Sequence, residues 1–255
     1  MRIRLVNPNT TWSMTRLIGE CARSVAAAGV QVEAVSPSMG PSSIESHYDE
    51  ALAVPGLLAE IAQGEADGVD GYVVACFGDP GLEAARELAR GPVVGIAEAG
   101  MRTATYLGRS FSVVTTLGRT TGRAWDLAHA YGVAGACRGI HACEIPVLEL
   151  ETSPDARERI TEACREALSR DGSDVIVLGC AGMADLCAHV SEAIGAPVVD
   201  GVAAATVAVQ GLVTLGLSTS TVGEYASPPP KRYDGLLSGF GLQPGSTDRD
   251  RRRTA

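Results

Sequence analysis

Aromatic side chains are scarce in this chain of 255 residues. Phe, Trp and Tyr make up 4% of it, although the hydrophobic fraction of 45% is ordinary for a globular protein. A core with so few rings must consist mainly of Ala, Val, Leu and Ile. The 30 glycines indicate many tight turns.

Positive charge is also in short supply. The chain has 21 Lys and Arg against 30 Asp and Glu, a net charge of −9. Nucleic acid is not expected as a partner, because phosphate binding needs concentrated positive charge. No apolar run approaches the roughly 20 residues of a membrane span, so no membrane association is expected. Met1 leads into a predicted strand without a signal-peptide pattern, and we expect a cytoplasmic protein.

The seven cysteines lack the regular close spacing of a disulfide framework. One of them lies in an unusual setting, the segment 73–80 (VVACFGDP). Its first three residues predict a buried strand, Gly78 permits a sharp turn, and Asp79 and Pro80 predict the N-cap and first residue of a helix. Cys76 would then lie beside a helix N-terminus, where the dipole and free N–H groups favour a thiolate.

The same pattern occurs again at 175–183 (VIVLGCAGM), where Cys180 follows Cys76 by 104 residues. The segment 92–95 (PVVG) recurs 105 residues later as 197–200 (PVVD). Asn9-Thr10 matches Thr115-Thr116 with an offset of 106. These nearly constant offsets predict two copies of one unit, each with a cysteine at the same topological place.

Short apolar strands alternate with amphipathic helices along both copies. Strands are predicted at 2–6, 30–35, 71–75, 92–96, 110–115, 138–143, 174–179 and 197–199, and helices at 11–28, 50–64, 80–89, 97–107, 119–131, 154–170, 183–194 and 201–215. This order predicts an α/β fold with parallel sheets flanked by helices. Right-handed crossovers bring all strand-to-helix loops to one edge of each sheet, where α/β proteins bind ligands. The long loop 36–48 is typical of a lid or pocket wall.

Two cysteines that face each other across a cleft suit one reaction in particular. One thiolate takes a proton from a stereocentre, and the other group, as a thiol, returns a proton to the opposite face. This pattern favours racemisation or epimerisation without a cofactor. An isomerase or decarboxylase with one nucleophilic cysteine remains an alternative, as does a non-enzymatic two-domain protein that binds a small ligand. A nucleotide-dependent dehydrogenase is not expected, since no Gly-x-Gly-x-x-Gly follows a strand.

Five segments together resemble motifs of the hydantoin racemase and allantoin racemase family, within the aspartate/glutamate racemase superfamily. They are 6–10 (VNPNT), 40–46 (GPSSIES), 76–80 (CFGDP), 114–117 (VTTL) and 179–183 (GCAGM), and the resemblance spans about residues 3–235. It implies two pseudo-symmetric α/β domains with the active site in the cleft between them. It also implies that Cys76 and Cys180 are the catalytic acid/bases.

The resemblance further implies that the last long helix returns to the first domain. The expected division is therefore 1–97 plus about 203–240, then 98–202, with a flexible tail at 241–255 that includes the charge run 248–253.

The residues after each cysteine bear on the substrate. Amino-acid racemases of the superfamily have Asn-Thr after the first cysteine and Thr-His after the second, whereas this chain has Phe77-Gly78 and Ala181-Gly182. A zwitterion would lack partners here, and a buried unpaired charge is costly. A neutral cyclic ureide suits the site better, with backbone N–H groups stabilising a developing enolate. We therefore expect racemisation of 5-substituted hydantoins, with an allantoin racemase or an Asp/Glu-type racemase as alternatives.

The expected substrate contacts are Asn9, Ile44, Phe77, Gly78, Thr115, Thr116, Ala181 and Gly182. Glu98 and Asp200 follow corresponding strands, where they either influence the thiols or cap helices. Cys137, His141 and Cys143 share one strand face, but no fourth ligand is evident, so no metal is expected. No cofactor is expected, and the remaining cysteines and histidines are interpreted as packing or incidental residues. The assembly is expected to be a homo-oligomer.

Overall fold

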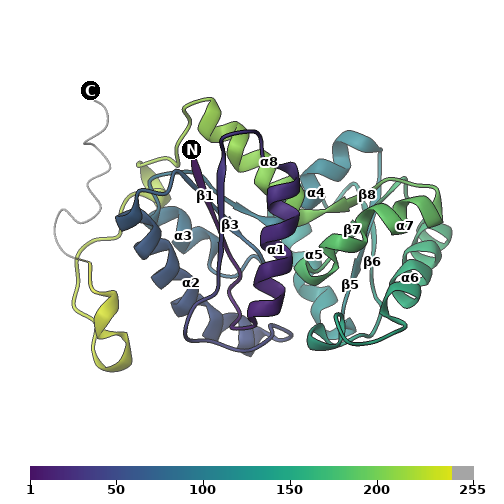
Figure 1. Ribbon diagram of the computed structural model, residues 1–255, viewed down its shortest axis with the longest axis horizontal. Coiled ribbons are helices and arrows are strands. Elements are labelled where there is room, and N and C mark those ends of the chain that lie inside the picture. The colour runs from purple at the N-terminus through teal and green to yellow at the C-terminus, as the bar shows by residue number, and fades with distance from the viewer. Residues whose placement is uncertain (243–255) are drawn as a thin grey trace.

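The computed structural model describes residues 1–242 and contains two parallel sheets of four strands each (Figure 1). In the first sheet the order is β2-β1-β3-β4, and in the second it is β6-β5-β7-β8. The first comprises β1 (Arg2–Val6), β2 (Gln31–Val35), β3 (Gly71–Val74) and β4 (Val93–Gly95). The second comprises β5 (Phe111–Thr115), β6 (Cys137–Ala142), β7 (Val175–Leu178) and β8 (Val198–Asp200). The identical strand order confirms the predicted repeat of one α/β unit.

The two cysteines occupy equivalent positions in this repeat. β3 ends at Val74 and β7 ends at Leu178. In the first sheet β3 lies between β1 and β4, and in the second sheet β7 lies between β5 and β8. Cys76 and Cys180 each come two residues after the strand end. Both therefore lie at the carboxyl edge of a sheet, as predicted.

One of the sequence matches that predicted the repeat, between Asn9-Thr10 and Thr115-Thr116, is wrong. Val6 pairs with the last residue of β3, and Val114 pairs with the last residue of β7. The counterpart of Thr115 is therefore Asn7, and the sequence match between Thr115 and Asn9 is out of register. The offset changes along the chain because the connections between corresponding strands differ in length.

Eight α-helices surround the sheets in the described residues. They are α1 (Trp12–Val25), α2 (His47–Asp67), α3 (Leu82–Leu88), α4 (Ile96–Leu107), α5 (Thr121–Ala130), α6 (Ala156–Asp171), α7 (Cys187–Ile194) and α8 (Gly201–Thr214). Each predicted helix is present, with changes at the ends. α2 begins earlier than predicted because the Ser46 side chain caps it, accepting from the Asp49 N–H. A 3₁₀ helix, Ala181–Leu186, precedes α7.

The predicted start of α3 is wrong for a tertiary reason. The helix begins at Leu82, not Pro80, and Gly81 precedes it in the left-handed region with φ of 66°. Asp79 also has a positive φ, 43°, and does not cap its own helix. Its carboxylate instead accepts from the backbone N–H groups of Ala97 and Glu98, at 3.2 and 3.0 Å, and so caps α4.

Asp200 caps α8, which is one of the two roles that the sequence suggested for it; the other was to influence the thiols. Its carboxylate accepts from the N–H groups of Val202 and Ala203 at 3.0 and 2.8 Å. Glu98, three residues after the end of β4, forms a 2.5 Å ion pair with Arg86. The strand register makes Gly95, and not Glu98, the counterpart of Asp200, because Gly95 pairs with the last residue of β3 and Asp200 pairs with the last residue of β7.

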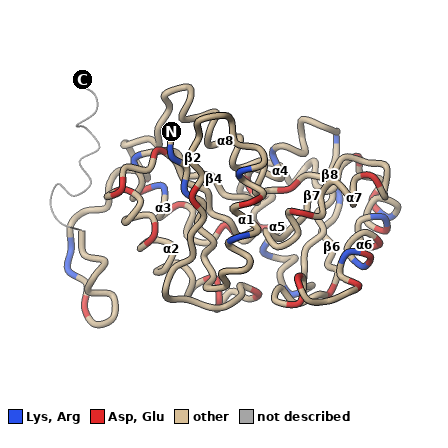
Figure 2. The backbone as a smooth tube through the Cα atoms, viewed as in Figure 1, with Lys and Arg blue, Asp and Glu red and all other residues tan. Residues whose placement is uncertain are grey.

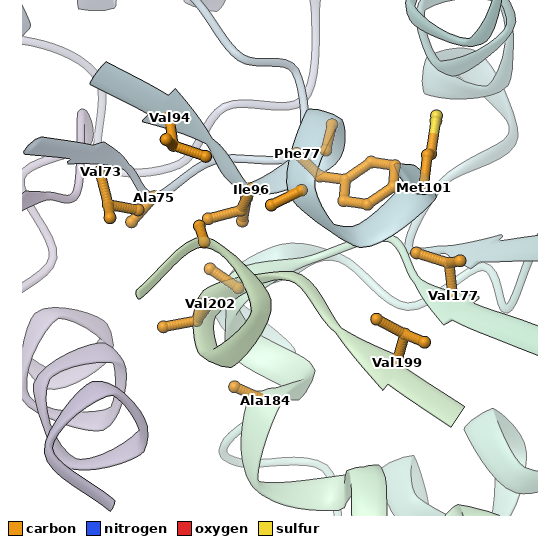
Figure 3. Packing of buried hydrophobic residues seen from close by; sticks show 14 of the residues in the cluster. Val73, Ala75, Phe77, Val94, Ile96, Met101, Val177, Ala184, Val199 and Val202 are labelled. Carbon is orange, nitrogen blue, oxygen red and sulfur yellow. The ribbon is translucent and has the colours of Figure 1, made fainter. Parts of the chain in front are cut away.

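α4 and α8 join the two halves of the molecule, of which the first contains the sheet β1–β4 and the second the sheet β5–β8. α4 follows the last strand of the first sheet and packs against β7 of the second, while α8 follows the last strand of the second sheet and packs against β3 and β4. The two helices also pack against each other. Figure 3 shows residues of one buried cluster that come from both sheets and from the two helices: Val73, Val94, Val177 and Val199 from the strands, Met101 from α4 and Val202 from α8. One apolar cluster therefore extends through both halves.

The chain after α8 lies against the first half. The Thr219 hydroxyl donates to the Gly91 carbonyl at 3.0 Å, and the Tyr225 hydroxyl donates to Glu83 of α3. These contacts and the position of α8 support the division of 1–97 plus about 203–240 against 98–202, which we keep as a proposal. Most of the predicted tail, residues 243–255, lies outside the described residues.

Charge is mixed over the surface of the described residues. Figure 2 shows acidic and basic residues interspersed along α6 and over the helices of the first half. Within residues 1–242, no helix combines the length and the apolar composition that crossing a membrane requires.

Candidate active site

A small cavity between the two halves brings together the residues that follow the strands. Nine of the ten predicted site residues line it: Asn9, Ile44, Cys76, Phe77, Gly78, Thr115, Thr116, Cys180 and Ala181. The rest of the lining comes from Met14, Glu50, Ala75, Thr120, Arg123, Ala124, Val147 and Gly179. Both cysteines therefore line the same cavity, one from each half.

The cavity is sized for a small molecule. Its free volume is about 60 Å³. Since one water needs roughly 10–15 Å³ by this measure, the space holds only a few water-sized groups.

The Cys76 thiol is half-buried, two residues after the end of β3. Burial raises its pKa to about 12, and the negative charges of Cys180, Glu50 and Asp79 act in the same direction. The backbone N–H of Gly78 opposes them, because it hydrogen-bonds the sulfur and favours the thiolate. The turn after β3 thus presents one N–H to the sulfur two residues before it.

The Cys180 thiol has a matching environment. Burial raises its pKa to about 12, and the backbone N–H of Gly182 opposes this by hydrogen bonding to the sulfur. Gly182 is the one predicted site residue that does not line the cavity. A Cβ there would lie 2.9 Å from Leu150 Cδ1 and 3.7 Å from both Cys180 Sγ and Met14 Cε. Its contribution is the backbone N–H behind the sulfur.

These environments differ from the sequence prediction of a stabilised thiolate. α3 begins six residues after Cys76, and a 3₁₀ helix rather than an α-helix follows Cys180. The dipole of a long helix therefore does not act directly on either sulfur. Burial outweighs the single N–H bond at each site, so both groups are mainly thiols at neutral pH.

The polar residues at the strand ends are largely engaged with the protein. The Thr115 hydroxyl donates to the Gly179 carbonyl at 3.0 Å. The Asn9 amide oxygen accepts from the Asn7 amide and the Thr11 N–H, both at 2.9 Å. The Asn9 amide nitrogen contacts the Met14 sulfur, a weak acceptor, at 3.4 Å. Of these groups, the Asn9 amide nitrogen has the weakest protein partner.

The loop 36–48 forms a wall of the cavity through Ile44. The neighbouring Glu45 carboxylate accepts from the Val147 N–H of the other half at 2.7 Å. The predicted function of this loop as a pocket wall is thus consistent with its position.

Sequence reasoning missed a polar pair in the cavity, Glu50 and Arg123. The Glu50 carboxylate lies 3.4 Å from Arg123 Nε, and the same guanidinium donates to the Gly78 carbonyl at 2.8 and 3.2 Å. Glu50 lies on α2 and Arg123 on α5, in different repeats. No local pattern connects them, and only the packing of the two halves reveals the contact.

The predicted strand face with Cys137, His141 and Cys143 lies apart from the residues that line the cavity. Cys137 and Cys143 are buried, and His141 Nε2 lies 2.6 Å from an Asp171 carboxylate oxygen. Within residues 1–242, no three His, Cys, Asp or Glu side chains are grouped so that they could hold a metal ion.

Known proteins are similar to this chain in sequence and in fold. A profile of the family described as Asp/Glu/Hydantoin racemase matches residues 3–209. Hydantoin racemases from Rhizobium meliloti and Pseudomonas sp. (strain NS671) are 48% and 44% identical to this chain. The alignments cover 92% and 97% of this chain, and 98% and 100% of those proteins.

Solved structures agree with this result. An allantoin racemase from Klebsiella pneumoniae has 49% identity and a TM-score of 0.92, covering 94% of this chain and 99% of its own. A glutamate racemase from Bacillus anthracis, 16% identical with a TM-score of 0.62, shares the fold alone. With its duplicated sheets and paired cysteines, the chain belongs to the Asp/Glu/hydantoin racemase family and is an isomerase of the racemase class.

Proposed function

We propose that this chain racemises 5-substituted hydantoins without a cofactor, and that Cys76 and Cys180 exchange the C5 proton from opposite faces of the ring. The observation that carries the proposal is that both cysteines, at equivalent places in two repeats, line one small cavity. Two acid/base groups on opposite sides of one carbon are what inversion by proton transfer requires.

In the proposed reaction, one cysteine is a thiolate and the other a thiol. The thiolate removes the C5 proton, and the electron pair of the C–H bond moves into the adjacent ring carbonyl to form an enolate. The second thiol then donates a proton to C5 on the other face. One proton has left and one has entered, and the charge has moved from the first sulfur to the second.

The backbone N–H groups of Gly78 and Gly182 stabilise whichever sulfur carries the charge. The other N–H groups of the two turns are the proposed donors to the enolate oxygen. Because burial leaves the thiolate a minor form, a substrate with an acidified C–H is favoured. The C5 proton of a hydantoin meets this need better than the α-proton of an amino acid.

The charges around the cavity also favour a neutral ring. Among the residues that line it, the charged side chains are Glu50 and Arg123, and they pair with each other. The carboxylate and ammonium of an amino acid would have no free partner of opposite charge in this lining. Hydantoin and allantoin contain the same neutral ring, and allantoin carries a ureido group at C5. Allantoin is therefore the second candidate substrate, supported by the 49% identical allantoin racemase.

The test uses single enantiomers of hydantoins with alkyl, aryl and ureido groups at C5, together with L-aspartate and L-glutamate. In D₂O, the enzyme should abolish the optical rotation of at least one hydantoin and incorporate deuterium at C5. The amino acids should keep their rotation. The matched control is the double variant C76S/C180S, which should do neither. Loss of rotation for an amino acid but for no hydantoin would overturn the proposal.

A further inference from the structure

The turn that carries Cys76 is held by side chains from the other half of the molecule. Arg123 of α5 donates to the Gly78 carbonyl through Nη2 at 2.8 Å and through Nε at 3.2 Å. Gly78 is the residue whose own N–H faces the Cys76 sulfur. Gly78 therefore accepts from the Arg123 guanidinium through its carbonyl, while its N–H favours the Cys76 thiolate.

A second side chain of the other half binds the next residue. Tyr131, which follows α5 directly, donates its hydroxyl to the Asp79 carboxylate at 2.6 Å. The same carboxylate caps α4 through the N–H groups of Ala97 and Glu98. Asp79 is thus fixed between the second half and the first turn of α4.

The local sequence alone would leave this turn loose. Gly78 has no side chain to restrict its backbone, and a Cβ there would lie 2.5 Å from the Glu50 carboxylate. Asp79 has a φ of 43°, a value that is uncommon for non-glycine residues, although Asp tolerates it better than most. By contrast, the Cys180 turn continues into the 3₁₀ helix Ala181–Leu186, which packs against α1 and α8.

We propose that Arg123 and Tyr131 are positioning residues, which hold the Gly78–Asp79 turn so that its N–H stays directed at the Cys76 sulfur. This inference rests on the proposed role of Cys76 as an acid/base. Neither side chain transfers a proton. Each acts through the turn, and the effect should be confined to one of the two thiols.

Four ionisable groups surround Cys76 and bear on the test. Cys180, Glu50 and Asp79 disfavour its thiolate, and the Arg123 guanidinium is bound at the adjacent Gly78 carbonyl. Because rates of thiol alkylation follow the thiolate fraction, they report the pKa of each cysteine separately. Cys180 in the same molecule is then an internal reference.

The experiment measures alkylation of Cys76 and Cys180 by iodoacetamide in R123M, Y131F and the wild-type enzyme, at several pH values below the pKa of both thiols. Mass spectrometry of the two peptides gives the ratio of the rates. For R123M, the ratio of the Cys76 rate to the Cys180 rate should fall about tenfold, because one charge-assisted hydrogen bond is lost. For Y131F the fall in this ratio should be smaller. R123K, which keeps a charged donor, should restore part of the ratio.

Matched controls are R119M and Y106F, since Arg119 is exposed near the start of α5 and Tyr106 is 84% exposed on α4. Neither should change the ratio. Racemisation by R123M should fall by a similar factor in both directions, because the two enantiomers are equal in energy. A ratio that stays the same, or rises because the turn has merely opened, would overturn the inference. The alkylation result is independent of substrate, so failure of the proposed reaction would show separately, as an inactive wild-type enzyme.

Discussion

At the scale of single residues, the pKa of each of the two thiols is set by two opposing effects. Burial raises the pKa of each to about 12, while one backbone N–H, from Gly78 or Gly182, favours the thiolate. In the proposed mechanism, the first effect keeps a proton available for donation, and the second stabilises the base that removes one. A pair of sites with the same balance suits a reaction that must run equally in both directions.

The raised pKa values predict how the rate depends on pH. In the proposed mechanism the active enzyme has one thiolate, and below the pKa the thiolate fraction rises about tenfold per pH unit. Racemisation, expressed as kcat/KM, should therefore increase steadily from about pH 7 to about pH 9 without a plateau. The spontaneous rate also rises with pH, so it is measured with C76S/C180S and subtracted. A profile that is already flat near neutral pH would show that the thiols ionise much more readily.

Individual residues also mark the limit of sequence interpretation. Cys76 and Cys180 could be found because each follows an apolar strand and precedes a small-residue turn. Asp79 looked like the cap of its own helix but caps α4, since the tertiary fold offered it other N–H donors. Arg123 could not be found, because its contact with Gly78 joins segments from different repeats.

At the scale of elements, the crossing of α4 and α8 fixes how the two halves meet. Gly201 opens α8 at this point, and a Cβ there would overlap the carbonyl oxygen of Ile96, the first residue of α4. Gly100 of α4 lies close by, where a Cβ would come within 3.5 Å of the Gly201 Cα. The absence of side chains lets the two helix starts approach closely.

This contact predicts that G201A destabilises the protein by about 1–3 kcal/mol, because the added methyl group forces the two helices apart. The control is G211A in the same helix, where a Cβ would meet no atom within 4 Å. That change should be neutral or stabilising by up to about 1 kcal/mol, since alanine is the better helix former. Urea denaturation of both variants checks this. Equal midpoints for the two would contradict the account of the crossing.

The helices and strands themselves were largely predictable. Alternating apolar strands and amphipathic helices are local patterns, and every predicted helix and strand is present within a few residues of its expected ends. The errors lie at helix starts such as that of α3, where a glycine and a tertiary hydrogen bond replace the expected local cap.

At the scale of the whole molecule, the repeat makes the site. Two sheets with the same strand order each place one cysteine in a shared cavity. α4 and α8 hold the halves together, because each packs against the sheet of the other half. The offset of the two cysteine turns revealed this repeat in the sequence. The offset could not give the register of every loop, since Asn7 and not Asn9 corresponds to Thr115.

The central claim is that the two sulfurs serve opposite faces of one carbon. Its most direct test follows deuterium exchange at C5 in D₂O for each enantiomer of a hydantoin that the wild-type enzyme racemises, using C76S and C180S separately. Both variants should lose racemisation, while each still exchanges the proton of one enantiomer, and a different one in the two variants. If either single variant inverts the substrate at close to the wild-type rate, or if both exchange the same enantiomer, the two-thiol account is wrong.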